Sequence, residues 1–353
     1  MSLVPFCKLL DPATYVACPW DLRTDAEGRR FWSDFFKQHI DTLVEQGVLA
    51  QVRRGADEGE ARDRARRCAG RLRERIDAFD ARPADAPRPV TILTYDRWRD
   101  GLLRDFGFPD PLMDLKAREN ERAAALLAGV CRRLDALPPR ERLRSIIEGV
   151  FAGNLFDLGA KDTAERFLAD DAPSFDATRA RLKPRPWLID DYEAIEARWL
   201  EGPAYRKAVV FIDNAGSDFV LGMVPLMRWL ALRGTRVLLV ANELATLNDM
   251  TIDDVRAWWP RLVEVEPSLA GLDIEPLSSG TGEPLIDLLG VSPRLNEAAA
   301  DADLVILEGM GRGVETNLDA RFSCDGLNIG MIKIPIVARR CGGQIYDLVC
   351  RFR

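Results

Sequence analysis

Polar residues directly follow short apolar segments in the second half of the 353-residue chain. Asp213 and Asn214 follow AVVFI, Glu308 follows LVIL, and Lys333 follows IGMI. Apolar segments of this length are typical of buried parallel strands, whose carboxyl ends meet at one edge of a sheet. Ligands bind outside that edge in open α/β sheets, so we expect these side chains to form one site.

The residue types at this edge suit a phosphate beside a hard cation. The turn DNAGSD (213–218) places a carboxylate and an amide ahead of a helix, and the free N–H groups of a helix N-terminus favour an anion. Asp249 follows the next expected strand, about one βαβ unit later. Carboxylate and amide oxygens are ligands for Mg²⁺, Mn²⁺ and related divalent ions. We therefore expect Asp213, Asn214 and Asp249 to hold a divalent metal.

Other residues near this edge are candidates for binding the phosphate. Lys333, expected to be buried, needs an anionic partner, which favours phosphate contact over a structural ion pair. In EGMGR (308–312), glycines permit a close backbone approach to an anion and Arg312 supplies a counter-charge. Asp218 is either a general base or a helix cap, and both roles remain open. The catalytic candidates are Asp213, Asn214, Asp218 and Asp249, and the substrate- or phosphate-binding candidates are Gly216, Ser279, Gly280, Glu308, Arg312 and Lys333.

Each motif also has a purely structural interpretation. An Asp-Asn pair after a strand is often only a turn, and Asn-Asp ahead of Thr251 is often only a helix cap. Their occurrence together after adjacent expected strands favours a functional site. His39 is the only histidine in the chain and lies in a segment with helical periodicity, which favours a structural role for it. A multi-histidine zinc site is therefore excluded, and we expect neither a Ser-His-Asp triad nor a Cys-His dyad.

The composition favours a small-molecule partner. The net charge of −7 provides no global positive field for nucleic acid or anionic lipid, so neither partner is expected. The seven cysteines contain no CxxC pair, which argues against a zinc cage or a disulfide framework. No apolar segment approaches the roughly 18 residues needed to span a bilayer. We expect a soluble, cytoplasmic protein that contacts no membrane.

The alternation of elements predicts an α/β fold. Residues 1–185 are expected to be mainly helical and residues 186–353 to form an α/β domain with a Rossmann-like, doubly wound, mostly parallel sheet on which the helical region packs. A helix over 218–233 is expected to end at Gly234. The expected strands cover 208–213, 236–242, 303–309, 328–333 and 344–352.

Several segments, in one order along most of the chain, resemble the damage-control phosphatase family (domain of unknown function 89) in its pantetheine-phosphate subgroup. This resemblance implies a metal-dependent phosphomonoesterase with a Rossmann-like core. By motif position it places metal ligands at Asp213, Asn214 and Asp249, the phosphate-facing lysine at Lys333, and the acidic residue that closes the DNAG motif at Asp218. The matching segments include 105–121, 146–167, 185–191, the stretch from FIDNAG to LNDMT, 278–288, 303–317 and 329–352.

One departure from the subgroup concerns the substrate. The subgroup usually has a histidine where this chain has Glu315, within GVETN (313–317). The expected function is metal-dependent hydrolysis (Mg, Mn, Co or Ni) of a small phosphorylated metabolite, 4'-phosphopantetheine or a damaged form of it, by a protein acting alone or as a homo-oligomer. The alternatives are a non-catalytic phosphometabolite-binding protein and an S-adenosylmethionine-dependent carboxyl methyltransferase, although no glycine-rich turn follows the first strand of the α/β half.

Overall fold

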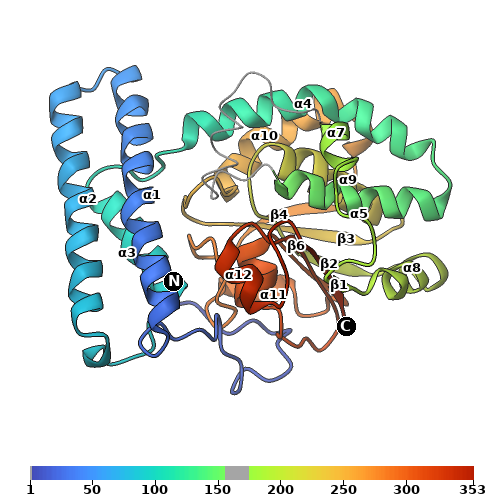
Figure 1. Ribbon diagram of the computed structural model, residues 1–353. Coiled ribbons are helices and arrows are strands. Elements are labelled where there is room, and N and C mark those ends of the chain that lie inside the picture. Colours follow the sequence, from blue (N-terminus) through green and yellow to red (C-terminus); the bar gives the residue numbers. More distant parts are fainter. Residues whose placement is uncertain (1, 156–174) are drawn as a thin grey trace. The chain divides into compact units, whose positions relative to one another are not determined.

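The computed structural model describes residues 2–155 and 175–353, which form two compact units (Figure 1). The smaller unit comprises Cys18–Leu115 and Leu244–Leu247. The larger unit comprises Met1–Ala17, Lys116–Glu243 and Asn248–Arg353. None of the described helices is both long and apolar enough to cross a membrane.

The smaller unit consists of helices α1 (Ala26–Arg53), α2 (Glu58–Ala81) and α3 (Ile92–Asp105). The carboxylates of Asp25 and Asp57 accept backbone N–H groups in the first turns of α1 and α2, so each helix begins with a side-chain cap. A buried ion-pair group lies in the same unit, where Arg99 contacts Asp96 and Asp100.

The larger unit contains a seven-stranded sheet in the order β1-β7-β6-β5-β2-β3-β4. Neighbouring strands are parallel except for the antiparallel pair β6 and β7. The predicted mostly parallel α/β fold is therefore confirmed. The strands are β1 (Ile189–Asp190), β2 (Lys207–Phe211), β3 (Arg236–Ala241), β4 (Ile274–Ser278), β5 (Leu304–Glu308), β6 (Asp325–Met331) and β7 (Leu348–Phe352).

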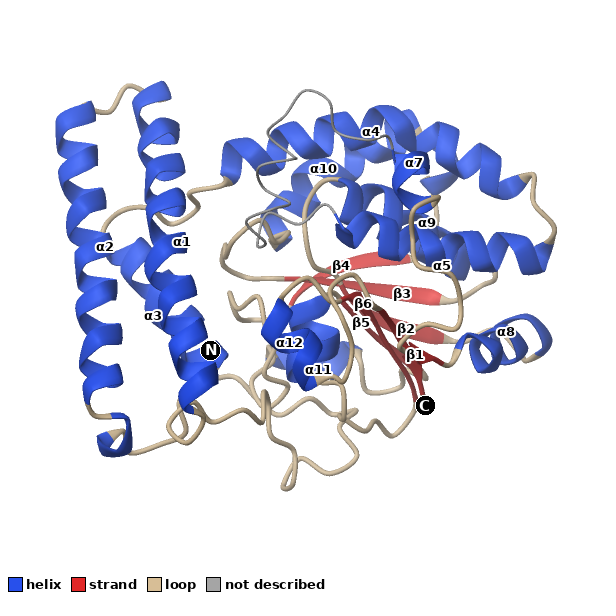
Figure 2. Cartoon of the chain, viewed as in Figure 1, coloured by secondary structure: helices blue, strands red, loops and turns tan. Residues whose placement is uncertain are grey.

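Helices cover both faces of this sheet, with α4, α5, α9 and α10 on one face and α11 and α12 on the other (Figure 2). Alternate residues of β2 pack into two different hydrophobic clusters, Ala208 and Val210 into one, and Val209 and Phe211 into the other. This burial on both faces explains the unbroken apolar strand sequence. The helices of this unit are α4 (Met113–Asp135), α5 (Pro139–Leu155), α7 (Phe175–Arg179), α8 (Tyr192–Glu201), α9 (Val224–Leu232), α10 (Ile252–Val265), α11 (Pro293–Ala298) and α12 (Pro335–Arg340), with π-helical turns η2 (Asp218–Met223) and η4 (Met310–Thr316).

Several features differ from the sequence expectations. The two-residue edge strand β1 was not expected, and the segment expected as one helix over 218–233 consists of η2 (Asp218–Met223) followed by α9 (Val224–Leu232). The edge strand β4 was not expected, because Glu275 and Pro276 interrupt its apolar character, as an edge position tolerates. Helices α4 and α5, which precede residue 185, group with the sheet in the larger unit rather than with α1–α3. The division at residue 185 into a helical region and a phosphatase domain stays a prediction.

Candidate functional site

Two loops pair at the carboxyl ends of β2 and β3 and bring the expected metal ligands together. Asn214 and Asp249 are partners in an isolated antiparallel bridge. The N–H of Met250 donates to the Asp213 carbonyl at 2.9 Å, and the N–H of Ala215 donates to the Asn248 carbonyl at 2.9 Å. Asp213 and Asp249, one βαβ unit apart in the sequence, thus lie on paired loops at the ends of neighbouring strands.

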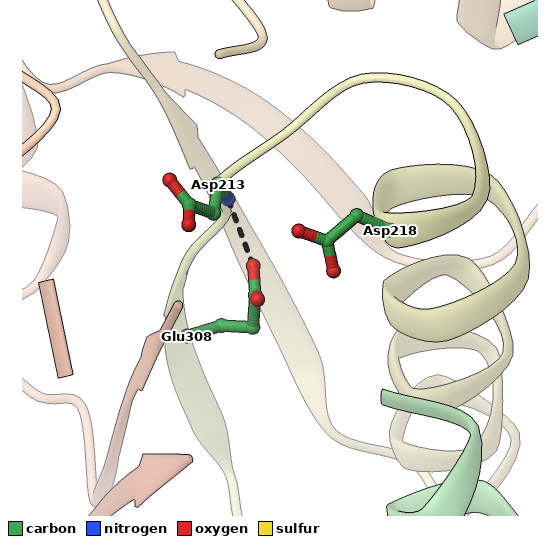
Figure 3. Close-up of side chains that lie close together, drawn as sticks. All are labelled: Asp213, Asp218 and Glu308. Carbon is green, nitrogen blue, oxygen red and sulfur yellow. Dashed lines mark hydrogen bonds between the residues drawn. The ribbon is translucent and has the colours of Figure 1, made fainter. Parts of the chain in front are cut away.

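Three buried carboxyl groups gather beside the first of these loops (Figure 3). Asp213 follows β2, Asp218 opens η2 and Glu308 ends β5, and ligand oxygens of the three residues lie within 4.8 Å of one another. Glu308 is fully buried, and its Oε2 accepts the Asp213 N–H at 2.9 Å. We call Asp213, Asp218 and Glu308 the acidic cluster.

The acidic cluster has the donor chemistry of a hard-cation site. Burial, followed by the charges of Asp218 and Asp213, raises the pKa of Glu308 well above its ordinary value. Oxygens on opposite sides of a Mg²⁺ ion are about 4.2 Å apart, so the spacing of the cluster suits such an ion. The backbone is also shaped around Asp213, because a Cβ added at Gly309 would lie 2.0 Å from Asp213 Oδ2. The residues present therefore fit a divalent cation.

The side chain of Asp218 accepts hydrogen bonds from two asparagines of the site. Its Oδ2 accepts the backbone N–H of Asn214 at 3.3 Å and the Asn214 side-chain amide at 2.9 Å. It also accepts the Asn154 amide at 3.0 Å, and Asn154 donates to Glu308 Oε1 at 3.1 Å. Of the two interpretations of Asp218, these contacts favour a place in the site.

Arg312 joins the two aspartates that were expected to hold the metal. It lies on η4, is 1% exposed, and donates to Asp213 Oδ1, to Asp249 Oδ2 at 2.6 Å and to Asn242 Oδ1 at 3.1 Å. Burial lowers the pKa of Arg312, but the charges of Asp249 and Asp213 outweigh burial and raise that pKa above its ordinary value. The phosphate contact expected for Arg312 stays a prediction.

Helix α4 contributes three residues that sequence reasoning did not single out. The Gly216 N–H donates to Asn120 Oδ1 at 2.6 Å, and a Cβ on Gly216 would lie 2.9 Å from Glu119 Cβ. Lys116 is buried and donates to the Asp249 carbonyl at 3.5 Å and to Asp254 at 2.7 Å. These three residues share one helix face through their i, i+3 and i+4 spacing.

Only the family resemblance could have indicated Lys116, Glu119, Asn120 and Asn154 from the sequence, because they lie inside the matching segments 105–121 and 146–167. A charged amphipathic helix otherwise has the pattern of a solvated surface. The α4 contact also engages the Gly216 N–H that was expected to bind phosphate, so this role of Gly216 stays a prediction.

The remaining candidates lie on other strand ends. Lys333 is buried two residues after β6, and its N–H contacts Met310 Sδ at 3.2 Å. Ser279 and Gly280 follow β4, where the Ser279 carbonyl accepts the Ser292 N–H at 2.7 Å and a Cβ on Gly280 would lie 2.8 Å from the Ser292 nitrogen. The contacts of Ser279 and Gly280 stabilise the turn toward α11. Phosphate binding by Lys333, Ser279 and Gly280 stays a prediction.

Comparison with known proteins identifies the family. Residues 32–349 match the model of the damage-control phosphatase ARMT1-like domain. The chain belongs to this family. The family predicted from the sequence motifs is confirmed. The chain is a phosphatase of the damage-control type.

Several individual proteins are similar to this chain. A damage-control phosphatase of Arabidopsis thaliana is 41% identical over 297 residues, covering 83% of this chain and 80% of that protein. The 4'-phosphopantetheine phosphatase of Mus musculus is 29% identical over 406 residues, covering 99% of this chain and 48% of that protein. Pantothenate kinase 2 of Oryza sativa is 34% identical over 388 residues, covering 100% of this chain and 42% of that protein. The chain thus spans less than half the length of the mouse and rice proteins.

A solved structure supports the fold. A protein of the domain-of-unknown-function-89 family from Pyrococcus horikoshii superposes with a TM-score of 0.61 at 20% sequence identity, covering 90% of this chain and 96% of that chain. This damage-control phosphatase therefore shares the architecture of that family over most of its length.

Proposed function

We propose that this damage-control phosphatase hydrolyses 4'-phosphopantetheine, or a damaged form of it, with a divalent cation. The observation that carries the metal requirement is the acidic cluster, three buried carboxyl groups with ligand oxygens within 4.8 Å. The substrate is supported by the name of the mouse relative and by the subgroup motifs. Mg²⁺, Mn²⁺, Co²⁺ and Ni²⁺ are all compatible with oxygen donors of this kind.

Asp213 is the proposed central ligand because it belongs to both candidate ligand sets. Asn214 and Asp249 reach it through the paired loops, and Asp218 and Glu308 lie beside it in the acidic cluster. A bound divalent cation lowers the pKa of a coordinated water and offsets charge on a phosphoryl oxygen.

The other residues bind the phosphate and handle the proton. Asp218 is the proposed acceptor for the proton of the attacking water, and the amide groups of Asn154 and Asn214 fix the orientation of its carboxylate. Lys333 is the proposed positive partner of the phosphate, since it is buried just after β6 and matches the phosphate-facing lysine of the family motif. A cytoplasmic location and a homo-oligomeric state remain further expectations.

The test is a screen of phosphate release from pantetheine phosphates, sugar phosphates and nucleotides, each with Mg²⁺, Mn²⁺, Co²⁺ and Ni²⁺. We expect 4'-phosphopantetheine or its oxidised form to give the highest kcat/KM, and only with a metal. Equal rates across the panel would contradict the proposed substrate. Binding of the same compounds without any phosphate release would instead support the non-catalytic alternative.

A further inference from the structure

The guanidinium group of Arg312 contacts one carboxylate oxygen of each of two aspartates that the proposed function assigns to a metal. It bridges Asp213, from the end of β2, and Asp249, from the loop after β3, and it also donates to Asn242 Oδ1. All three partners are at least nine-tenths buried, as is Arg312 itself. The contacts of Arg312 with Asp213 and Asp249 are therefore buried ion pairs rather than solvent-exposed ones.

We propose that Arg312 is the resident cation of the metal-free site and competes with the divalent metal for Asp213 and Asp249. This inference rests on the proposed function only in taking these two aspartates as ligands. A guanidinium group and a divalent cation that both contact the same two buried carboxylates repel each other strongly. Metal binding and the Arg312 contacts therefore exclude one another.

The local chain explains which part of Arg312 must move. The Arg312 carbonyl accepts the Asn317 side-chain amide at 2.9 Å, and Thr316 donates to the Gly311 carbonyl at 2.6 Å. The backbone of η4 is thus held by its own contacts, so displacement falls on the Arg312 side chain. Single π-helical turns of this kind occur frequently at functional sites.

The contacts of Arg312 also stabilise the metal-free protein. Without a cation, Asp213 and Asp249 would be two buried carboxylates with like charge, and such a pair opposes folding. Arg312 supplies the compensating charge, and the affinity of the metal is reduced by the free energy needed to displace it. A guanidinium displaced in this way becomes available to the phosphate of the substrate.

The test measures Mn²⁺ binding by calorimetry on the full chain, wild type against Arg312→Gln. Gln keeps hydrogen-bonding capacity but removes the competing charge, so we expect the Kd for Mn²⁺ to fall roughly tenfold to a hundredfold, the range typical of coupling between two ligands. Arg312→Lys retains a competing cation and should stay closer to wild type.

A matched control is Arg228→Gln. Arg228 is also buried on the larger unit and is paired with a carboxylate, Asp135, at 2.7 Å, but its other partner is Ser268 and not a site residue. Both Gln variants should lower the Tm of the metal-free protein, whereas only Arg312→Gln should bind Mn²⁺ more tightly. If metal-free Arg312→Gln is unfolded, added Mn²⁺ should restore its native circular dichroism.

An unchanged or weaker affinity of Arg312→Gln, or failure of Mn²⁺ to restore its fold, would overturn the competition. If Mn²⁺ binding by the wild type depends on Asp213 but Arg312→Gln binds Mn²⁺ no more tightly, this inference fails and the proposed function stands. If neither protein binds Mn²⁺, both fail.

Discussion

Gly309 provides a sensitive test of the site because its missing side chain makes room for Asp213. It has a φ of +99°, and an added Cβ would lie 2.0 Å from Oδ2, 2.5 Å from Cγ and 2.9 Å from Cβ of Asp213. Contacts under 3.0 Å are essentially never seen for real Cβ atoms, so the carboxylate of Asp213 must retreat by about 1 Å in Gly309→Ala. Rotation alone does not suffice, because the Asp213 Cβ is also too close.

The control for a positive φ without a steric clash is Gly234→Ala. Gly234 has a φ of +91° just beyond α9, and an added Cβ would meet nothing within 4 Å. Gly309 has a ψ of 159°, in a backbone region that is essentially restricted to glycine, so Gly309→Ala should also lose more folding free energy than the control. The Mn²⁺ affinity and the kcat/KM of folded Gly309→Ala, rather than its stability, therefore report on Asp213.

A displacement of about 1 Å near the reacting atoms can lower a rate by about a hundredfold. We expect Gly309→Ala to lose about that factor in kcat/KM for 4'-phosphopantetheine and to bind Mn²⁺ more weakly. Gly234→Ala should lose stability alone, as followed by urea unfolding. The reasoning is refuted if folded Gly309→Ala keeps wild-type kcat/KM and Mn²⁺ affinity.

Three further substitutions test separate parts of the site. Lys333→Ala should leave Mn²⁺ affinity intact but weaken inhibition by inorganic phosphate, and unchanged inhibition would argue against a phosphate contact. Glu315→His should raise kcat/KM for 4'-phosphopantetheine about tenfold if about 1.4 kcal/mol of repulsion is relieved, whereas no change at low or high salt would make Glu315 a bystander. Because burial and the charges of Asp218 and Asp213 raise the pKa of Glu308, the chelated protein should lose stability as the pH rises from the ordinary glutamate pKa through the raised one. Glu308→Gln should flatten that slope in urea titrations, and an unaltered slope would contradict the assignment.

The sequence was informative where burial imposes a simple pattern. Apolar runs located β2, β3, β5, β6 and β7, and their ends located the polar residues that converge at one sheet edge. The pairing of Asn214 with Asp249 follows from the parallel order of β2 and β3. The sheet edge at which a polar residue lies is thus predictable from the strand that precedes it, whereas the strands β1 and β4 were missed.

Side-chain partnership was less predictable. Asn120 and Asn154 lie on α4 and α5, where an amide among helical residues carries no signature of the loop or carboxylate that it contacts. The EGMGR motif indicated a charge near the site but not that Arg312 joins Asp213 and Asp249. Helix-capping rules could not decide between the two roles of Asp218, general base or helix cap, because these rules consider only the local sequence. One partner of Asp218 is Asn154, which is 64 residues away.

The central claim is that phosphate release requires a divalent cation held by Asp213. The most direct measurement is the rate of phosphate release from 4'-phosphopantetheine by chelated protein before and after Mn²⁺ is restored, for wild type, Asp213→Asn and the exposed control Asp319→Asn. Wild type and the control should be inactive when chelated and recover with Mn²⁺. Asp213→Asn should remain at least about a thousandfold lower with its fold intact, since a metal supplies several kcal/mol of charge stabilisation. Chelator-resistant phosphate release by wild type, or full Mn²⁺-dependent activity of Asp213→Asn, would contradict the claim.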